Sequence, residues 1–592
     1  MSRKTVISYS LIGIIPVVWV SLLIAPYLDE GLINMLLNLS NINPFHIELV
    51  ENSLKTIFIF LLIYIFIILY YLTTRKNYRK GEEHGSAKWG TAKEVNKKYK
   101  QLPELNNKIL TKNVVIGLNG KIHRRNLNTL IIGGSGSGKT RFYAKPNIMQ
   151  CNTSFIVLDP KGEILRDTGN LLEHEGYDIK VLDLINMEKS HCYNPFVYLK
   201  SDNDVQKLVT NLFKSTTPKG SSSSDPFWDT AASMLLLALV FYLVYEAPEY
   251  EQNFSMVMEM LRAGNVNEDD DGIPSVLDIL FQELEIRNPE HIAVKYYRDY
   301  RGGSAKTLKS IQITLASRLD KFNLESLSQL ISKDELDLNS LGEKKTALFA
   351  LIPDNDTSFN FLVSILYTQL FQQLFFLADH KYRGSLPVHV HFVMDEFANV
   401  SLPDDFAKIL SVMRSREISV SIILQNLSQL KALFENDWES IVGNCDELLY
   451  LGGNEQSTHK FVSEFLGKST IDMNSYGKTA GKNGSYSTNY QLSGRELLTP
   501  DEVRMLNNDY AILFIRGEKP IKDRKYDILK HPNIKYTTDG KGKAYIHGID
   551  KIQNNIKTNT ITETIIDNYE IIYCDEIDDY FKRLEKEDEN EK

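Results

Sequence analysis

The sequence GGSGSGKT at residues 133–140 places four glycines and one lysine between two regular segments. The apolar run LNTLII (127–132) precedes it and predicts a strand, and RFYAKPNIM (141–149) follows it and predicts a helix. Its spacing, with Gly133, Gly138, Lys139 and Thr140 at the defining positions, fits the phosphate-loop pattern in full. Glycines let successive backbone N–H groups curl around an anion, and the following helix adds its positive end. The stretch therefore predicts a nucleoside triphosphate site.

All eight residues of this loop are assigned to ATP. We expect the ammonium group of Lys139 to reach the β- and γ-phosphates and the hydroxyl of Thr140 to hold Mg²⁺. The predicted ATP-binding residues are Gly133, Gly134, Ser135, Gly136, Ser137, Gly138, Lys139 and Thr140.

A phosphate loop needs a second, acidic strand to complete the metal shell, and VHVHFVMDEF at 388–397 supplies it. Its first seven residues predict a buried strand that ends at Asp395 and Glu396. Asp395 is predicted to bind Mg²⁺ through water, and Glu396 to polarise the attacking water as a general base. His389 and His391 lie two apart with no cysteine or third histidine nearby, so they are interpreted as packing residues.

The following stretch predicts a helix over 403–416 and a strand over 418–424. In ring-forming nucleotide motors this strand ends in a polar sensor of the γ-phosphate, and Gln425 stands there. Arg414 or Arg416 is a candidate arginine finger for a neighbouring subunit. An arginine at a helix end also has a simpler interpretation, as a solvated group favourable to the helix dipole. The predicted catalytic residues are Lys139, Glu396, Gln425 and Arg416.

Further apolar runs predict the rest of the sheet. The run SFIVLDPKGE predicts a strand whose end presents Asp159 and Lys161 beside the nucleotide. Strands alternating with helical stretches favour a mostly parallel sheet covered on both faces. The predicted fold is an α/β, RecA-like P-loop ATPase domain, with further strands near 155–158, 179–184, 347–352 and 511–515.

Two apolar segments near the N-terminus, 6–28 and 54–72, are each long enough to cross a membrane, since a spanning helix needs about 20 apolar residues. Basic residues lie before the first and after the second, whereas the loop between them carries acids, which predicts that both ends are cytoplasmic. The chain is therefore expected to be a multi-pass protein of the cell (plasma or inner) membrane, with its bulk in the cytoplasm. The basic residues are Arg3, Lys4, Arg75, Lys76, Arg79 and Lys80.

A helical block interrupts the α/β pattern. Its apolar stretch from Ala232 to Tyr245 is short for a span and predicts a buried helix. The polar, glycine-rich stretch 475–494 predicts a mobile segment, and the acidic C-terminal end predicts a disordered or docking tail. The predicted organisation is a membrane anchor (1–75), a nucleotide-binding domain in two parts (76–201 and 342–535), an inserted all-α domain (202–341) and a C-terminal extension (536–592).

Charge and cysteine content limit the partners. The net charge of −9 excludes a surface broadly coated with basic residues, so any contact with a polyanion is local, such as a channel lining. The four cysteines are scattered, which fits free thiols in a reducing compartment and gives no zinc site: Cys151, Cys192, Cys445 and Cys574.

The ordered series of motifs resembles the TraG/TraD-type coupling proteins of type IV secretion, from the first span to about Pro532. The matching stretches are GSAKWGTAKE (85–94), the phosphate loop, VLDPKGE (157–163), YNPF (193–196), FWDTAASMLLLAL (227–239), MDEFANV (394–400), RSREISVSIILQNLSQL (414–430), GNCDELLYLGGNE (443–455), GRELLTPDEVRML (494–506) and GEKPIKDRKYDILKHP (517–532).

This resemblance implies a homo-hexameric ring with ATP and Mg²⁺ at subunit interfaces and a central pore for single-stranded DNA. It implies that the helical insertion contacts substrate, including DNA bound to its relaxase, and that the ring works with the proteins of a type IV secretion channel. It also implies that an acidic tail docks processing proteins.

Three alternatives to a conjugative DNA transfer ATPase stay open. In the first, the chain is a substrate receptor that uses nucleotide only as an assembly switch. In the second, it is a chromosome-partitioning translocase of the FtsK/SpoIIIE type, and in the third a coupling protein for protein cargo alone. Three features stand against the chromosome-partitioning translocase. The chain has only two predicted spans, it has no recognisable winged-helix end domain, and it contains the helical insertion.

Overall fold

The computed structural model of the full chain describes residues 10–28, 43–74, 82–217, 226–264, 274–400, 402–403, 405–478 and 486–548. The chain divides into two compact units: residues 1–86 with 470–494, and residues 87–469 with 495–592.

The larger unit is built on a sheet of nine strands in the order β13-β12-β9-β3-β8-β7-β4-β6-β5. The seven strands from β9 to β5 are parallel, and β12 and β13 extend the sheet with antiparallel pairings. The strands are β3 (Thr129–Ile132), β4 (Ser154–Asp159), β5 (Asp178–Asp183), β6 (Thr346–Leu351), β7 (Val390–Met394), β8 (Ile418–Leu424), β9 (Glu447–Tyr450), β12 (Tyr510–Ile515) and β13 (Ile521–Arg524), beside a separate pair, β1 (Asn107–Ile109) and β2 (Val115–Gly117).

Both faces of this sheet are buried because side chains alternate along each strand. In β3, Leu130 and Ile132 join one buried apolar cluster, whereas Ile131 joins a second cluster on the opposite face. The central strands therefore consist of near-continuous apolar residues, as expected for a parallel sheet covered on both sides.

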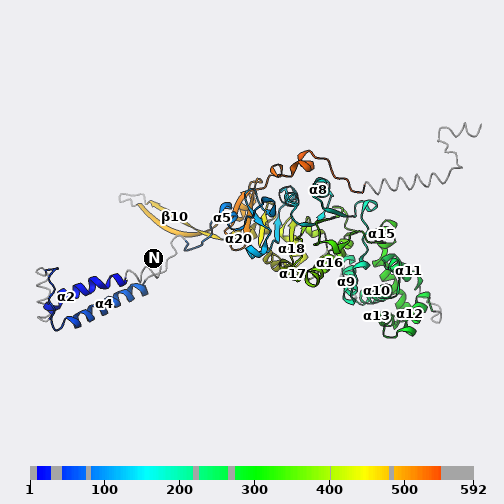
Figure 1. The fold of residues 1–592 in the computed structure, drawn as a ribbon, viewed down its shortest axis with the longest axis horizontal. Coiled ribbons are helices and arrows are strands. Elements are labelled where there is room, and N and C mark those ends of the chain that lie inside the picture. Colours follow the sequence, from blue (N-terminus) through cyan, green and yellow to red (C-terminus); the bar gives the residue numbers. More distant parts are fainter. Residues whose placement is uncertain are drawn as a thin grey trace, which may run out of the picture. The chain divides into compact units, whose positions relative to one another are not determined.

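Helices cover the two faces of the sheet (Figure 1). One face packs against α7 and α8, and the other against α16 and α17. The helices of this part are α5 (Ala92–Tyr99), α6 (Gly120–His123), α7 (Lys145–Ile148), α8 (Glu163–His174), α16 (Asn360–Phe376), α17 (Phe406–Met413), α18 (Leu427–Leu433), α19 (Trp438–Gly443), α20 (Gln456–Leu466) and α21 (Pro500–Arg504).

Between β5 and β6 the regular elements of the described residues are all helices, with α10 at the centre of the bundle. Two of the helices that are long and apolar enough to cross a membrane lie within this unit, where α10 is half buried and α16 is mostly buried. Most of their apolar residues belong to the protein core, as predicted for residues 232–245. The helices of this block are α9 (Asp202–Thr216), α10 (Pro226–Glu246), α11 (Phe254–Ala263), α12 (Val276–Arg287), α13 (Ile292–Arg301), α14 (Ala305–Arg318) and α15 (Glu325–Leu330).

The smaller unit contains the two other helices long and apolar enough to span a bilayer, at Ser10–Leu28 and Ser53–Tyr71. They belong to α2 (Ile14–Leu28) and α4 (Ser53–Thr74), which pack against each other, and the Tyr64 hydroxyl donates to the Ser10 carbonyl at 3.0 Å. Most of their large apolar side chains are exposed, which suits a lipid environment.

The described residues of the stretch predicted to be mobile form strands. Strands β10 (Lys468–Lys478) and β11 (Tyr486–Glu496) pair as a two-stranded sheet. Backbone pairing between these two consecutive strands gives the polar stretch a regular structure that its composition did not indicate.

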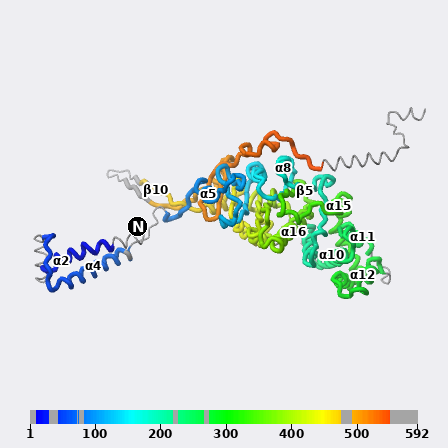
Figure 2. The backbone as a smooth tube through the Cα atoms, in the orientation of Figure 1, coloured from blue at the N-terminus to red at the C-terminus, as the bar shows by residue number. Residues whose placement is uncertain are grey.

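The C-terminal part of the described chain runs along α8 (Figure 2), where Tyr536 stacks on His174 with ring centroids 4.3 Å apart. The predicted α/β, RecA-like fold with an all-α insertion and two N-terminal apolar helices is confirmed. The predicted acidic tail, the basic residues used to orient the spans, and Cys574 lie outside the described residues.

Candidate nucleotide site

The phosphate loop follows β3 at the carboxyl end of the parallel strands, and its backbone is tied to both neighbouring strands. The N–H of Gly133 donates to the Leu424 carbonyl at 3.0 Å, and the N–H of Gly134 donates to the Gly452 carbonyl at 2.8 Å. Gly138 has φ +81°, a conformation that side chains disfavour. A side chain at Gly133 would lie 2.4 Å from the Ser137 hydroxyl. Gly138 is therefore required by backbone conformation, and Gly133 by close packing.

The two predicted metal-binding groups meet, although 255 residues separate them in sequence. The Thr140 hydroxyl donates to Asp395 Oδ2 at 2.7 Å. Asp395 is only 5% exposed, and burial raises the pKa of its carboxyl, against the opposing effects of Thr140 and Lys139. A hydroxyl and a carboxylate at the mouth of a phosphate loop are the oxygen ligands that Mg²⁺ prefers, so these residues fit the ion.

Lys139 turns back into the loop, where its ammonium group donates to the Gly133 carbonyl at 2.9 Å and to the Gly134 carbonyl at 3.4 Å. Desolvation lowers the pKa of Lys139, and the charges of Asp395 and Glu396 oppose that shift. Phosphate oxygens offer this ammonium group stronger, charge-assisted partners than backbone carbonyls do.

Glu396 has φ 53° and ψ 46°, a left-handed conformation that costs a residue with a side chain about 1–3 kcal/mol. Its carboxylate accepts a hydrogen bond from the Asn399 amide at 2.9 Å. The backbone N–H of Glu396 donates to Asp395 Oδ1 at 3.1 Å. The two consecutive carboxylates at the end of β7 thus have different partners, Thr140 for Asp395 and Asn399 for Glu396.

Asp159 brings a third carboxyl to the same edge, because β4 pairs with β7 and Leu158 lies opposite Met394. Its side chain is fully buried, and Oδ2 accepts from the Leu165 N–H at 2.9 Å while Oδ1 lacks a partner among the described residues. Burial raises the pKa of Asp159 to about 7, and Asp395 contributes to the rise. Lys161, predicted to lie beside the nucleotide, pairs with Asp354 at 3.4 Å.

Gln425 directly follows β8, next to the strands that carry the loop and the acid pair, and its backbone N–H donates to the Gln429 side chain at 2.9 Å. Arg416 precedes β8. Because seven residues span about 20 Å, Arg416 lies at the other edge of the sheet from Thr140 of the same chain. Its guanidinium group donates two hydrogen bonds to the Asp379 carboxylate, at 2.8 and 2.9 Å. A role in a neighbouring subunit stays a prediction for Arg416 and Arg414.

A chain of hydrogen bonds missed by the sequence analysis lies behind the loop. The Tyr143 hydroxyl, one turn into the helix after the loop, contacts the Ser421 hydroxyl at 2.7 Å, and His391 bridges Ser421 and Ser419 at 2.9 and 2.6 Å. Burial lowers the pKa of His391 well below its ordinary value, so the imidazole is neutral. His391 is a core residue, as interpreted from the sequence.

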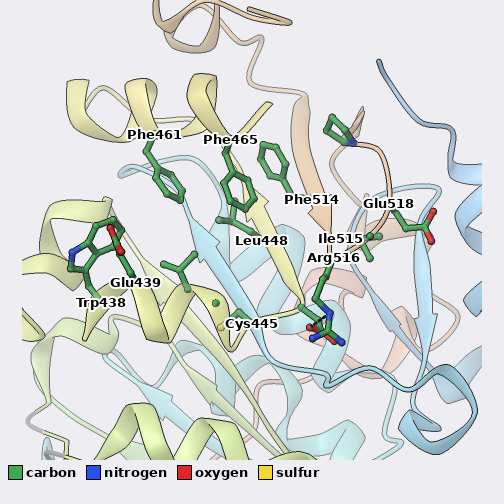
Figure 3. Close-up of a pocket in the computed structure, with 15 residues that line it drawn as sticks. Trp438, Glu439, Cys445, Leu448, Phe461, Phe465, Phe514, Ile515, Arg516 and Glu518 are labelled. Atoms are coloured by element: carbon green, nitrogen blue, oxygen red, sulfur yellow. Dashed lines mark ion pairs between the residues drawn. The ribbon is translucent and has the colours of Figure 1, made fainter. Parts of the chain in front are cut away.

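A separate cavity of about 560 Å³ lies near the amino end of β9 (Figure 3). A row of aromatic rings from α19, α20 and β12 lines it, with centroid separations of 6.4, 5.5 and 5.0 Å. The phosphate loop contacts the opposite, carboxyl end of the same strand. The cavity is therefore distinct from the phosphate loop. The aromatic residues are Trp438, Phe461, Phe465 and Phe514.

A family model for conjugative DNA transfer by the type IV secretory system matches residues 88–545. The chain belongs to this family. The predicted resemblance to type IV coupling proteins is thereby confirmed, and the matched residues include the loop, the acid pair and the helical block.

Individual members are distant in sequence. The chain is 22% identical to the VirD4 protein of Rhizobium radiobacter over 420 residues, 69% of this chain and 58% of that protein. It is 20% identical over 402 residues to the conjugal transfer protein TraG of the same organism, covering 66% of this chain and 60% of TraG. The match thus spans about three-fifths of these relatives.

Solved structures of the plasmid coupling protein TrwB share the fold. TrwB in complex with ADP and Mg²⁺ matches with a TM-score of 0.54 and 15% identity over 74% of this chain and 94% of that one. An unbound form of TrwB matches with a TM-score of 0.54 and 17% identity over 78% and 98% of the two chains. At this identity the likeness establishes the fold alone.

Proposed function

We propose that this member of the conjugative DNA transfer family is a membrane-anchored ATPase that couples relaxase-bound single-stranded DNA to a type IV secretion channel. The observation that carries the proposal is the 2.7 Å contact between Thr140 and Asp395 beside a complete phosphate loop. TrwB, which shares the fold, has been solved with ADP and Mg²⁺. ATP and Mg²⁺ are accordingly the proposed ligands of this site.

Each residue of the site has a proposed task. The loop amides and Lys139 bind the phosphates, and Thr140 with Asp395 holds Mg²⁺, which would neutralise phosphate charge. Glu396 accepts a proton from the attacking water, and Gln425 senses the γ-phosphate. Arg416 or Arg414 acts on the nucleotide of an adjacent subunit.

The proposed assembly is a homo-hexameric ring around a pore for DNA. We assign the nucleotide-binding domain to residues 76–201 and 342–535, and substrate contact to the all-α insertion at 202–341. Residues 1–75 anchor the ring in the cell membrane, and 536–592 form a C-terminal extension.

ATP hydrolysis by the full-length protein in lipid nanodiscs tests the proposed function. We expect the rate to rise when single-stranded DNA is added, and to rise less with duplex DNA, because a pore for one strand excludes the wider duplex. The assay measures released phosphate against DNA concentration. A basal rate that is indifferent both to DNA and to Lys139→Ala would contradict the proposal.

The proposed topology places the loop between the two spans outside the cytoplasm. In a variant whose native cysteines are serines, Ser40→Cys is expected to react with a membrane-impermeant maleimide on intact cells. The matched variant Lys93→Cys should react only after lysis, because it follows the second span. Labelling of Lys93→Cys on intact cells, or labelling of Ser40→Cys only after lysis, would overturn the topology.

A further inference from the structure

Lys525 reaches the phosphate loop because the last two strands of the sheet are antiparallel. Strand β12 runs opposite to β9, and β13 reverses again, with Arg524 opposite Tyr510. The backbone N–H of Lys525 donates to the Asp509 carbonyl at 2.8 Å. The chain therefore leaves β13 at the edge of the sheet where the parallel strands end and the phosphate loop begins.

The side chain of Lys525 is bonded to the loop itself. Its ammonium group donates to the Ser137 carbonyl at 2.9 Å and to the Asn508 side-chain oxygen at 2.8 Å. Lys525 is 6% exposed, and its ammonium group lies 5.5 Å from the centre of the Phe142 ring. Phe142 also covers Gly138, where an added Cβ would lie 2.3 Å from the ring. Lys525 and Phe142 thus enclose the loop on one side.

This arrangement is costly for a merely structural lysine. Among the described residues no carboxylate lies within ion-pair distance of Lys525. A buried ammonium group without an ionic partner loses hydration that neutral oxygens replace only in part. The charge of Lys525 is directed at a carbonyl of the phosphate loop, which indicates that Lys525 acts on this loop.

A peptide bond is planar and trans, so the N–H of Gly138 points opposite to the Ser137 carbonyl. We propose that Lys525 is a positioning residue for the phosphate loop: by holding the Ser137 carbonyl on the outer side, it directs the Gly138 N–H toward bound phosphate. The inference rests on the proposed function, because it concerns the same ATP site. Loop amides bind an anion only when several converge on it, so fixing one peptide plane raises affinity.

The hydrogen bond from Lys525 to the Ser137 carbonyl is strongest while Lys525 is protonated. Burial lowers the pKa of Lys525 to about 8, and the charge of Asp509 opposes the shift. The other groups facing the ammonium group are neutral: the Ser137 carbonyl, the Asn508 amide and the Phe142 ring. A phosphate anion nearby favours the protonated form, so nucleotide binding is linked to proton uptake, and affinity should fall as pH rises above about 8.

The experiment measures binding of a fluorescent ADP analogue with Mg²⁺ to the full-length protein between pH 7 and 9.5. Lys525→Met is expected to raise the Kd at pH 7 at least about tenfold, since it removes a charge-assisted hydrogen bond. Lys525→Arg should keep most of the affinity and lose the decline above pH 8, because a guanidinium stays charged. The matched control Lys522→Met, on the exposed side of β13, should behave as the wild type.

Wild-type affinity in Lys525→Met, or an unchanged alkaline decline in Lys525→Arg, would overturn the inference. The Arg variant decides the question even where Lys525→Met fails to fold, because a residue that only supports the fold leaves the pH profile unchanged. Failure of the wild-type protein to bind the analogue would instead refute the proposed nucleotide site, and this inference with it.

Discussion

Replacing Lys139 by alanine is expected to reduce ATP hydrolysis by at least about a hundredfold. Lys139 is the one loop side chain able to place a positive charge on the β- and γ-phosphates, and removing a single electrostatic donor from such a site costs about 10²–10³ in rate. In the described structure its ammonium group is held by the Gly133 carbonyl at 2.9 Å, so it is already directed into the loop.

Phosphate release, measured with the full-length protein at saturating ATP, checks this expectation. The control is Lys97→Ala, which removes an exposed lysine from α5 and leaves net charge equal in the two variants. Both should keep the melting temperature of the nucleotide-free wild type, because neither lysine packs in the core. Hydrolysis in Lys139→Ala within about threefold of the control would contradict the site assignment.

The substitution Glu396→Gln is expected to lower hydrolysis by about 10²–10⁴ while ATP stays bound, because the amide keeps the shape of the side chain and cannot accept a proton. The neighbouring metal ligands are untouched, so binding of ATP with Mg²⁺ should stay near the wild-type value. Single-turnover hydrolysis and nucleotide binding, measured on the same preparation, separate the two effects. The matched control is Glu464→Gln, on the exposed side of α20.

The same variant separates a motor from a receptor that uses ATP only for assembly. A motor loses DNA transfer in a mating assay when hydrolysis stops, whereas an assembly switch that holds ATP keeps it. We expect transfer to be lost in Glu396→Gln and retained in Glu464→Gln. Transfer at normal frequency in a variant that binds but does not hydrolyse ATP would exclude the motor.

The parts of the site that local sequence determines were predicted. The loop and the pair Asp395–Glu396 depend on spacing within a few residues, and strand β8 was placed at 418–424, as found. Thr140 and Asp395, both assigned to Mg²⁺ from the sequence, lie 2.7 Å apart in the structure, because parallel strands end at a common edge.

Features set by strand pairing or by side chains distant in sequence were missed. Strand β13 contains the charged sequence IKDR, and only its pairing with β12 makes it a strand and delivers Lys525 to Ser137. Strands β10 and β11 are mostly polar, and they pair with each other as a two-stranded sheet. The Asp379 partner of Arg416 lies 37 residues away, beyond any motif. Local propensity is a weak guide wherever tertiary pairing decides.

The most direct test of the central claim is a structure of the full-length protein with a non-hydrolysable ATP analogue and Mg²⁺. The account predicts Mg²⁺ at about 2.1 Å from the Thr140 hydroxyl oxygen, with Asp395 bound through water and the γ-phosphate at Lys139. Nucleotide bound elsewhere, such as the aromatic cavity beside Trp438, or a metal held without Thr140 and Asp395, would contradict it.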